Sequence, residues 1–292
     1  MNPFDSVTAL EDATPLDRVT GPVREGAQRL LGNGAVRDAL HGVWLGHPLH
    51  PVLVQVPIGA FMSAAILDLM PGENRAADTL IATGMLATVP AAASGLADWS
   101  QMHQQQQRVG IVHAAANTVA TLLYGASLVT RRRGNRGAGT LLSMAGLGVL
   151  GFSGFLGGHL AFRQAAGANH NEAVPHLVTP GWQDLCALDD LAGDGQPQLR
   201  ELGTVPLLVV RRGDRIDVLS DRCSHLSGPL HEGTVSIDGE CITCPWHGST
   251  FSLEDGSVRG GPATAPQHAF DVRVQNGRVE VRLPGAGGPQ TV

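Results

Sequence analysis

Apolar residues are distributed very differently in the two halves of this chain of 292 residues. Between residues 48 and 163 they form long, almost uncharged stretches, and after residue 182 they form short β-branched runs separated by turn residues. A helix needs about 20 residues to cross a bilayer. Four of the long stretches come close to that length, and the pattern predicts four transmembrane helices at 51–70, 79–97, 109–130 and 138–162.

These four stretches are rich in Gly, Ala, Ser and Thr rather than Leu. Small residues let membrane helices approach closely, so we expect a compact four-helix bundle over residues 46–165. A soluble Ala-rich helical domain is the alternative, but four well-spaced uncharged segments are hard to arrange in water. Residues 1–45 are polar, with weak helical periodicity around 23–40, and we expect a soluble tail without a secretory signal peptide.

The C-terminal half reads as a series of short strands. Arg212-Gly213-Asp214, and the dipeptides Asp-Gly at 238–239, Asp-Gly at 255–256 and Asn-Gly at 276–277, each separate two β-branched segments. Such turn residues favour tight hairpins. We therefore predict an all-β domain of about ten strands over residues 182–285. A flexible polar linker at 166–181 precedes it, and a short tail at 286–292 follows.

Two Cys/His pairs stand out in the β half. Cys223 and His225 form a C-x-H motif, and after eighteen intervening residues Cys244 and His247 form a C-x-x-H motif. In a two-iron cluster, one iron can take two thiolates while the other takes two imidazoles. Zinc also accepts two Cys and two His ligands, although zinc fingers prefer C-x-x-C paired with H-x-x-x-H.

The pairs, together with Cys-Pro-Trp-His-Gly-Ser-Thr-Phe at 244–251, resemble the Rieske-type [2Fe-2S] domain. The resemblance implies an all-β fold and an electron-transfer role, with Cys223, His225, Cys244 and His247 as the cluster ligands. It also implies that the Ser249 hydroxyl donates to a bridging sulfide of the cluster. Residues 260–262 and Pro266 resemble the loop that covers the cluster, with a plain surface turn as the alternative.

The sequence departs from the respiratory Rieske pattern at three positions. Gly228 and Trp246 stand where those proteins carry an extra disulfide, and Phe251 stands where high-potential members carry a tyrosine. Fewer donors to the sulfurs stabilise the reduced cluster less. We therefore expect a potential in the lower part of the Rieske range of roughly −150 to +300 mV.

Five histidines gather at one end of the predicted bundle. We call face A the membrane face where the first helix begins and the fourth ends, and face B the opposite face. The histidines could hydrogen-bond to neighbouring side chains and lipid headgroups. Alternatively, they could hold a haem b, a quinone or a metal, with His113 and His159 as the deepest pair and His50 as a further candidate residue. The five are His47, His50, His103, His113 and His159.

The opening of this region, Gly-His-Pro-Leu-His-Pro at 46–51, resembles an uncharacterised prokaryotic four-helix membrane domain family. The resemblance covers roughly residues 40–165. It implies residence in the membrane, here the plasma membrane of a prokaryote crossed several times, but no activity.

The two halves of the chain differ in net charge, and the positions of the arginines indicate which membrane face is cytoplasmic. Residues 1–171 hold 10 acids and 11 arginines, and residues 172–292 hold 16 acids and 9 arginines, a balance that excludes a nucleic-acid partner. Five arginines in the short face-B loops favour a cytoplasmic face B and an exterior Rieske domain. Thr130-Arg131-Arg132 partly resembles a twin-arginine export signal, but Gly134 and Asn135 replace the apolar residues that should follow.

Two functions follow from these patterns. The first is a membrane-bound Rieske protein that transfers one electron to or from a redox partner protein. The alternative is a self-contained membrane oxidoreductase whose histidine-rich face binds haem b or quinol and exchanges electrons with the cluster. The sequence leaves open whether the chain is an electron-transfer protein or an oxidoreductase component, and a redox sensor is a third, less specific reading. Membrane lipid is a partner in every case.

Overall fold

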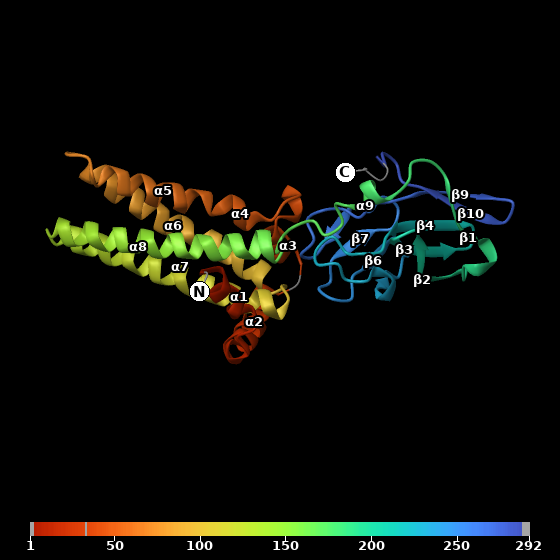
Figure 1. Cartoon of the computed structure of the whole chain (residues 1–292), viewed down its shortest axis with the longest axis horizontal. Coiled ribbons are helices and arrows are strands. Elements are labelled where there is room, and N and C mark those ends of the chain that lie inside the picture. The colour runs from red at the N-terminus through yellow and green to blue at the C-terminus, as the bar shows by residue number, and fades with distance from the viewer. Residues whose placement is uncertain (1–2, 33, 288–292) are drawn as a thin grey trace. The chain divides into compact units, whose positions relative to one another are not determined.

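The computed structural model describes residues 3–32 and 34–287. The chain divides into two compact units, one helical and one built of β-strands (Figure 1). The first contains the chain up to Val36 together with Pro48–Ala166, and the second contains Arg37–His47 together with the chain from Gly167 onward. The chain thus passes between the units three times. The fold class predicted from the sequence is confirmed.

Within the described residues of the helical unit, four helices are long and apolar enough to cross a membrane, namely Leu49–Leu67, Asn74–Trp99, Gln104–Arg132 and Arg136–Arg163. They agree with the four predicted spans to within a few residues at most ends. The first is divided at Val54 into two short helices, and the last ends in a π-helical turn. The corresponding elements are α4 (Leu49–Leu53), α5 (Gln55–Leu67), α6 (Asn74–Trp99), α7 (Gln104–Arg132), α8 (Arg136–Gly158) and η3 (His159–Arg163).

Small residues let the helices of this bundle pack closely around a few large buried side chains, while many other large apolar side chains point outward. A Cβ at Gly84 would lie 2.6 Å from the Phe61 ring, and one at Gly146 would lie 3.2 Å from Tyr124. The Phe61 and Tyr124 rings stack with centroids 3.8 Å apart. Because the interior is filled by close helix approach, the outward apolar side chains are available to lipid. They include Ile66, Leu86, Val89, Leu122, Leu141 and Phe152.

The described part of the N-terminal segment up to Val36 differs from the expected tail, because it is helical and packs on the bundle. Val7 joins a small apolar cluster with Val109 and Leu156. The Arg108 guanidinium donates to both carboxylate oxygens of Asp17, each at 2.7 Å. The weak sequence periodicity did not reveal this docking. The helical segments before the first span are α1 (Pro3–Glu11), η1 (Thr14–Leu16), α2 (Asp17–Leu31), α3 (Ala35–His41) and η2 (Val43–Leu45).

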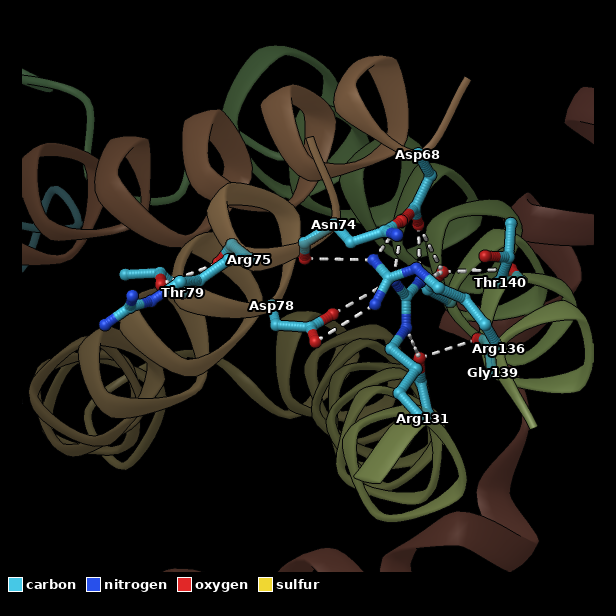
Figure 2. Close-up of polar contacts among 11 residues, drawn as sticks. Asp68, Asn74, Arg75, Asp78, Thr79, Arg131, Arg136, Gly139 and Thr140 are labelled. Atoms are coloured by element: carbon cyan, nitrogen blue, oxygen red, sulfur yellow. Dashed lines mark hydrogen bonds and ion pairs between the residues drawn. The ribbon is translucent and has the colours of Figure 1, made fainter. Parts of the chain in front are cut away.

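A charged network joins all four spans at face B (Figure 2). Arg131 of α7 donates to both carboxylate oxygens of Asp68 at the end of α5, and to Asp78 of α6 at 3.2 Å. Arg136 of α8 donates to Asp78 at 3.1 Å. The Arg131 and Asp68 side chains are 1% and 0% exposed, so two positive and two negative charges balance in a largely buried site. We call these four residues the face-B charge network.

As far as the structure describes it, to residue 287, the β unit consists of three small antiparallel sheets, with strand orders β1-β10-β9, β2-β3-β4 and β5-β6-β7-β8. The predicted hairpins are present: β3 pairs with β4, β5 with β6, β7 with β8 and β9 with β10. The sequence did not single out β1 and β2. The strands are β1 (Gln183–Ala187), β2 (Asp194–Leu202), β3 (Val205–Arg212), β4 (Arg215–Ser220), β5 (Thr234–Val235), β6 (Cys241–Thr243), β7 (Thr250–Ser252), β8 (Val258–Gly260), β9 (Asp271–Gln275) and β10 (Arg278–Arg282), with short helices α9 (Val174–Leu177), η4 (Leu188–Asp190) and η5 (Leu230–Glu232).

The linker is more ordered than the sequence suggested. Asn171 is buried in the β unit and donates to the Ser220 hydroxyl at 2.5 Å. The backbone N–H of His170 donates to the carbonyl of Ser224 at 2.9 Å. The part of the predicted linker around residues 170–178 is therefore fastened to the β unit. The predicted tail begins at residue 286, and its residues 288–292 lie outside the described part of the chain.

Candidate metal centre

The two Cys/His motifs lie in two loops with the same backbone pattern. In the first loop, the Cys223 N–H donates to the carbonyl of Gly228, and the Ser227 N–H donates back to the Cys223 carbonyl. In the second, the Cys244 N–H donates to the carbonyl of Ser249, and the Gly248 N–H donates back to the Cys244 carbonyl. Each loop thus closes on its cysteine through the residues four and five positions later. We call them the first and second Cys/His loops, residues 223–228 and 244–249.

The same local conformation occurs in both loops and explains the glycine of the second one. The fifth residue of each loop has a left-handed backbone, with φ of 61° at Ser227 and 75° at Gly248. Glycine adopts this conformation freely, whereas serine does so at some cost. The first loop follows β4, and the second connects β6 to β7, so the strands hold both loops at one end of the sheets.

The loops bring the four predicted ligands together. Cys223 and Cys244 are buried in the apolar core beneath the loops, while His225 and His247 are partly exposed. The two imidazole rings lie edge to face, with centroids 5.1 Å apart. The site therefore has an inner thiol side and an outer imidazole side, which is the division of ligands that a two-iron cluster requires.

The two thiols interact directly. A hydrogen bond from Cys223 lowers the pKa of Cys244 to about 7, and the same contact, together with burial, raises the pKa of Cys223. Iron binds cysteine as thiolate, and a thiol with a pKa near 7 loses its proton readily at neutral pH. Among the residues that the structure describes, no three His, Cys, Asp or Glu side chains gather around a single ion. The separation of the two thiols from the two imidazoles fits a two-iron cluster, in which each iron takes two protein ligands.

Ser249 connects the second loop to the first. Its side chain is fully buried and hydrogen-bonds to the thiol of Cys223, which counteracts the rise in the pKa of that thiol. Its hydroxyl oxygen accepts a hydrogen bond from the Ala263 N–H at 3.1 Å. The Ser249 hydroxyl, which is directed at the Cys223 sulfur, is therefore able to donate a hydrogen bond to a sulfur of a cluster.

The three positions that depart from the respiratory pattern lie against the Cys/His loops or in the core beneath them. A Cβ at Gly228 would lie 2.8 Å from the Cys244 sulfur and 3.1 Å from the Trp246 ring. The two positions of the missing disulfide are therefore adjacent, and they are filled by the indole. Phe251 is fully buried in the core beneath the loops. All four cysteines, each in the described part of the chain, are free.

A buried carboxylate beside the first loop was not apparent from the sequence. Asp221 is 3% exposed, and its two oxygens accept from the backbone N–H of His231 at 2.7 Å and from the ring Nδ1 of His231 at 2.8 Å. Sequence reasoning missed it because an Asp two residues before a Cys carries no signal of burial.

The bundle histidines have partners that do not favour a haem. His113 Nδ1 donates to the Ser153 carbonyl at 2.8 Å, and Asn117 Nδ2 lies 3.1 Å from His113 Nε2. His159 Nε2 lies 2.6 Å from a carboxylate oxygen of Glu11. The nitrogens that would coordinate iron are thus engaged in hydrogen bonds, and neither the structure nor the comparisons below support the haem or quinol alternative.

The histidine that approaches His113 is His50, with ring centroids 6.4 Å apart. His50 Nδ1 donates to the Ala91 carbonyl at 2.8 Å. His103 directly precedes α7, and its backbone N–H donates to the Gln106 side chain at 2.9 Å. His47 is exposed and belongs to the β unit rather than to the bundle. The five histidines thus do not form one site.

Comparison with known families agrees with the division of the chain into a membrane bundle and a Rieske domain. The Rieske [2Fe-2S] domain family matches residues 181–276. A family described as Predicted membrane protein (DUF2231) matches residues 46–170. The second match accounts for the resemblance noted at the start of the first span.

Several ferredoxins are similar to the C-terminal part of the chain. Ferredoxin CarAc of Metapseudomonas resinovorans is 36% identical over 100 residues, covering 34% of this chain and 92% of that protein. The anthranilate 1,2-dioxygenase ferredoxin subunit of Burkholderia cepacia is 35% identical over 102 residues, covering 35% and 92%.

Among solved structures, the ferredoxin of carbazole 1,9a-dioxygenase from Nocardioides aromaticivorans IC177 is 28% identical, covering 35% of this chain and 97% of that one with a TM-score of 0.33. The family assignment rests on the Cys/His loops, the domain match and the identity to the two ferredoxins. Through residues 181–276 the chain belongs to the Rieske [2Fe-2S] ferredoxin family, and it joins that domain to a DUF2231 membrane domain.

Proposed function

We propose that this protein is a membrane-bound Rieske ferredoxin that carries one electron to or from a redox partner protein. Cys223 and Cys244 would bind one iron of the cluster, and His225 and His247 the other. The observation that carries the proposal is the matched pair of loops, which brings two buried thiols and two outer imidazoles to one place. When bound, the cluster supplies one-electron redox chemistry.

The arrangement of the protein residues leaves the imidazole side of the site accessible to a redox partner. The thiol side lies in an apolar core that excludes water, and the imidazole side is partly exposed. Pro245 and Trp246 are exposed beside His247 and offer an apolar rim for a docking partner. The excess of acids over arginines in residues 172–292 suits a partner with a basic docking surface.

The relatives indicate the class of partner. Two similar proteins are a ferredoxin subunit of anthranilate 1,2-dioxygenase and the ferredoxin of carbazole 1,9a-dioxygenase. We infer that the partner of this chain is likewise an oxidoreductase component that exchanges single electrons. Within this proposal the membrane domain anchors the ferredoxin and has no redox group of its own.

Iron analysis and EPR spectroscopy of the purified full-length protein, reduced with dithionite, test the proposal. We expect two irons per chain and the spectrum of a reduced cluster with mixed Cys and His ligation. Cys244→Ser should abolish both, while Cys241→Ser is the matched control, because Cys241 lies only three residues away and outside both Cys/His loops. Zinc in place of iron, or a haem band in the optical spectrum, would contradict the proposal.

A further inference from the structure

Asp38 contacts the loop that resembles the cover of the cluster, although 223 residues separate them along the chain. The backbone N–H of Gly261 donates to Asp38 Oδ1 at 2.9 Å. A Cβ at Gly260 would lie 3.2 Å from Asp38 Oδ2, so both carboxylate oxygens face this loop. We call residues 260–262 the cover loop.

Asp38 is part of the same compact unit as the Rieske domain. Arg37–His47 and the chain from Gly167 onward form one unit, even though the residues on either side of Arg37–His47 belong to the helical unit. Asp38 lies in neither of the two family matches, which cover residues 46–170 and 181–276. The contact is therefore an addition that this chain makes to its ferredoxin domain.

The cover loop lies directly against the second Cys/His loop. Gly261 has φ of +89°, and a Cβ there would meet the Gly248 carbonyl at 2.6 Å and the Ser249 Cα at 2.7 Å. Only glycine fits so close an approach. On the far side of Gly261, the Ala263 N–H donates to the Ser249 hydroxyl. Asp38 on one side and Ser249 on the other thus hold the cover loop against the loop that carries Cys244 and His247.

We propose that Asp38 is a positioning residue for the Rieske site. It fastens the cover loop, and it places a negative charge close to the second Cys/His loop, because Asp38 contacts Gly261 and Gly261 packs against Gly248. The inference rests on the proposed function. Reduction adds one electron to the site, and a nearby carboxylate opposes that added negative charge. Asp38 therefore favours the oxidised state, in the same direction as the missing disulfide and the missing tyrosine.

Redox titration of the full-length protein, followed by EPR, separates the charge from the hydrogen bond. Asp38→Asn removes the charge but keeps an oxygen that can accept from Gly261. We expect the reduction equilibrium to shift about fivefold or more toward the reduced state, because the variant removes a charge that opposes the added electron. Asp38→Glu should restore the wild-type midpoint, and Asp214→Asn, which makes the same charge change in the exposed β3–β4 turn, should leave it unchanged.

Hydrogen exchange provides a readout that does not depend on the cluster. Asp38→Ala should speed exchange at the Gly261 amide at least tenfold, while Asp38→Asn should speed it much less. A midpoint that Asp38→Asn leaves unchanged, or that Asp214→Asn shifts equally, would overturn the electrostatic role. Unaltered exchange in Asp38→Ala would overturn the contact. If the wild-type protein gave no Rieske spectrum, the proposed function itself would fail, and the exchange result would still report the contact.

Discussion

At the scale of single residues, Ser249 stands between the two Cys/His loops. Its hydroxyl is directed at the Cys223 sulfur and is fully buried. A hydrogen bond to a sulfur ligand stabilises the reduced, more negative state. We therefore expect Ser249→Ala to lower the midpoint potential by about 40 mV, the equivalent of roughly 1 kcal/mol for one electron. Protein-film voltammetry would measure it. Ser257→Ala, which alters a serine in an exposed turn, should leave the potential unchanged.

His268 gives the β unit a pH-dependent stability. Burial lowers the pKa of His268 below its ordinary value of 6.5, and its Nε2 donates to the Asn171 carbonyl at 3.1 Å. The folded state therefore holds a neutral ring, whereas the unfolded chain takes up a proton below about pH 6.5. Because the unfolded state then binds more protons, stability is fully present above pH 6.5 and falls as the pH drops below it.

We expect urea unfolding, followed by the visible circular dichroism of the cluster, to show lower stability at pH 5.5 than at pH 7.5. In His268→Gln this difference should be smaller. An identical pH dependence in wild type and variant would show that other groups are responsible, since the variant removes only this imidazole.

At the scale of secondary-structure elements, the four spans are joined by the face-B charge network. Arg131 on α7 and Asp68 after α5 are both buried, so removing the Asp68 charge leaves Arg131 paired with the partly exposed Asp78 instead of with a buried carboxylate. Breaking a buried ion pair costs about 3–5 kcal/mol. We expect Asp68→Asn to destabilise the bundle by that order, whereas Asp78→Asn should cost less because Asp78 is 34% exposed.

Thermal unfolding of the detergent-solubilised protein, followed by helical circular dichroism, would compare the two variants. The double variant Asp68→Asn with Arg131→Gln should recover part of the lost stability, because it removes the buried Arg131 charge as well. Equal effects of Asp68→Asn and Asp78→Asn would contradict the burial argument.

At the scale of the whole molecule, the orientation of the bundle in the membrane decides on which side the Rieske domain lies. The folded bundle pairs Arg131 and Arg136 with aspartates and leaves Arg75, Arg132 and Arg133 exposed at face B. Three exposed arginines in short loops still favour a cytoplasmic face B. Arg131 is buried in the network, so the folded helix does not present the arginine pair that resembled an export signal.

We therefore propose that the Rieske domain lies on the exterior side. Alkaline phosphatase, which is active only outside the cytoplasm, fused after Val292 should be active, and a fluorescent reporter that folds only in the cytoplasm should be dark. The same pair of reporters fused within residues 132–135 should give the opposite result. Cytoplasmic activity of the Val292 fusion would reverse the assignment.

Much of the architecture was accessible from the sequence. Four uncharged stretches of bilayer length predicted the spans, and turn dipeptides between β-branched runs predicted four hairpins, because both signals are local. The Cys/His motifs predicted the candidate ligands for the same reason: their spacing is confined to two short loops. The N-terminal helices, the docked linker and the partners of the bundle histidines were not accessible, because each depends on a contact between residues far apart in the chain.

The joining of a membrane bundle to a Rieske domain can be read from the amino-acid sequence, since apolar length, turn chemistry and motif spacing are properties of short segments. The pairing of the polar groups, in contrast, became visible in the folded chain. The tertiary structure paired Arg131 with Asp68, gave His113 to Ser153 and Asn117 rather than to a haem, and brought Asp38 to Gly261. The physical reason is that a buried polar group must find a partner, and which partner lies within reach is settled only when the whole chain is packed.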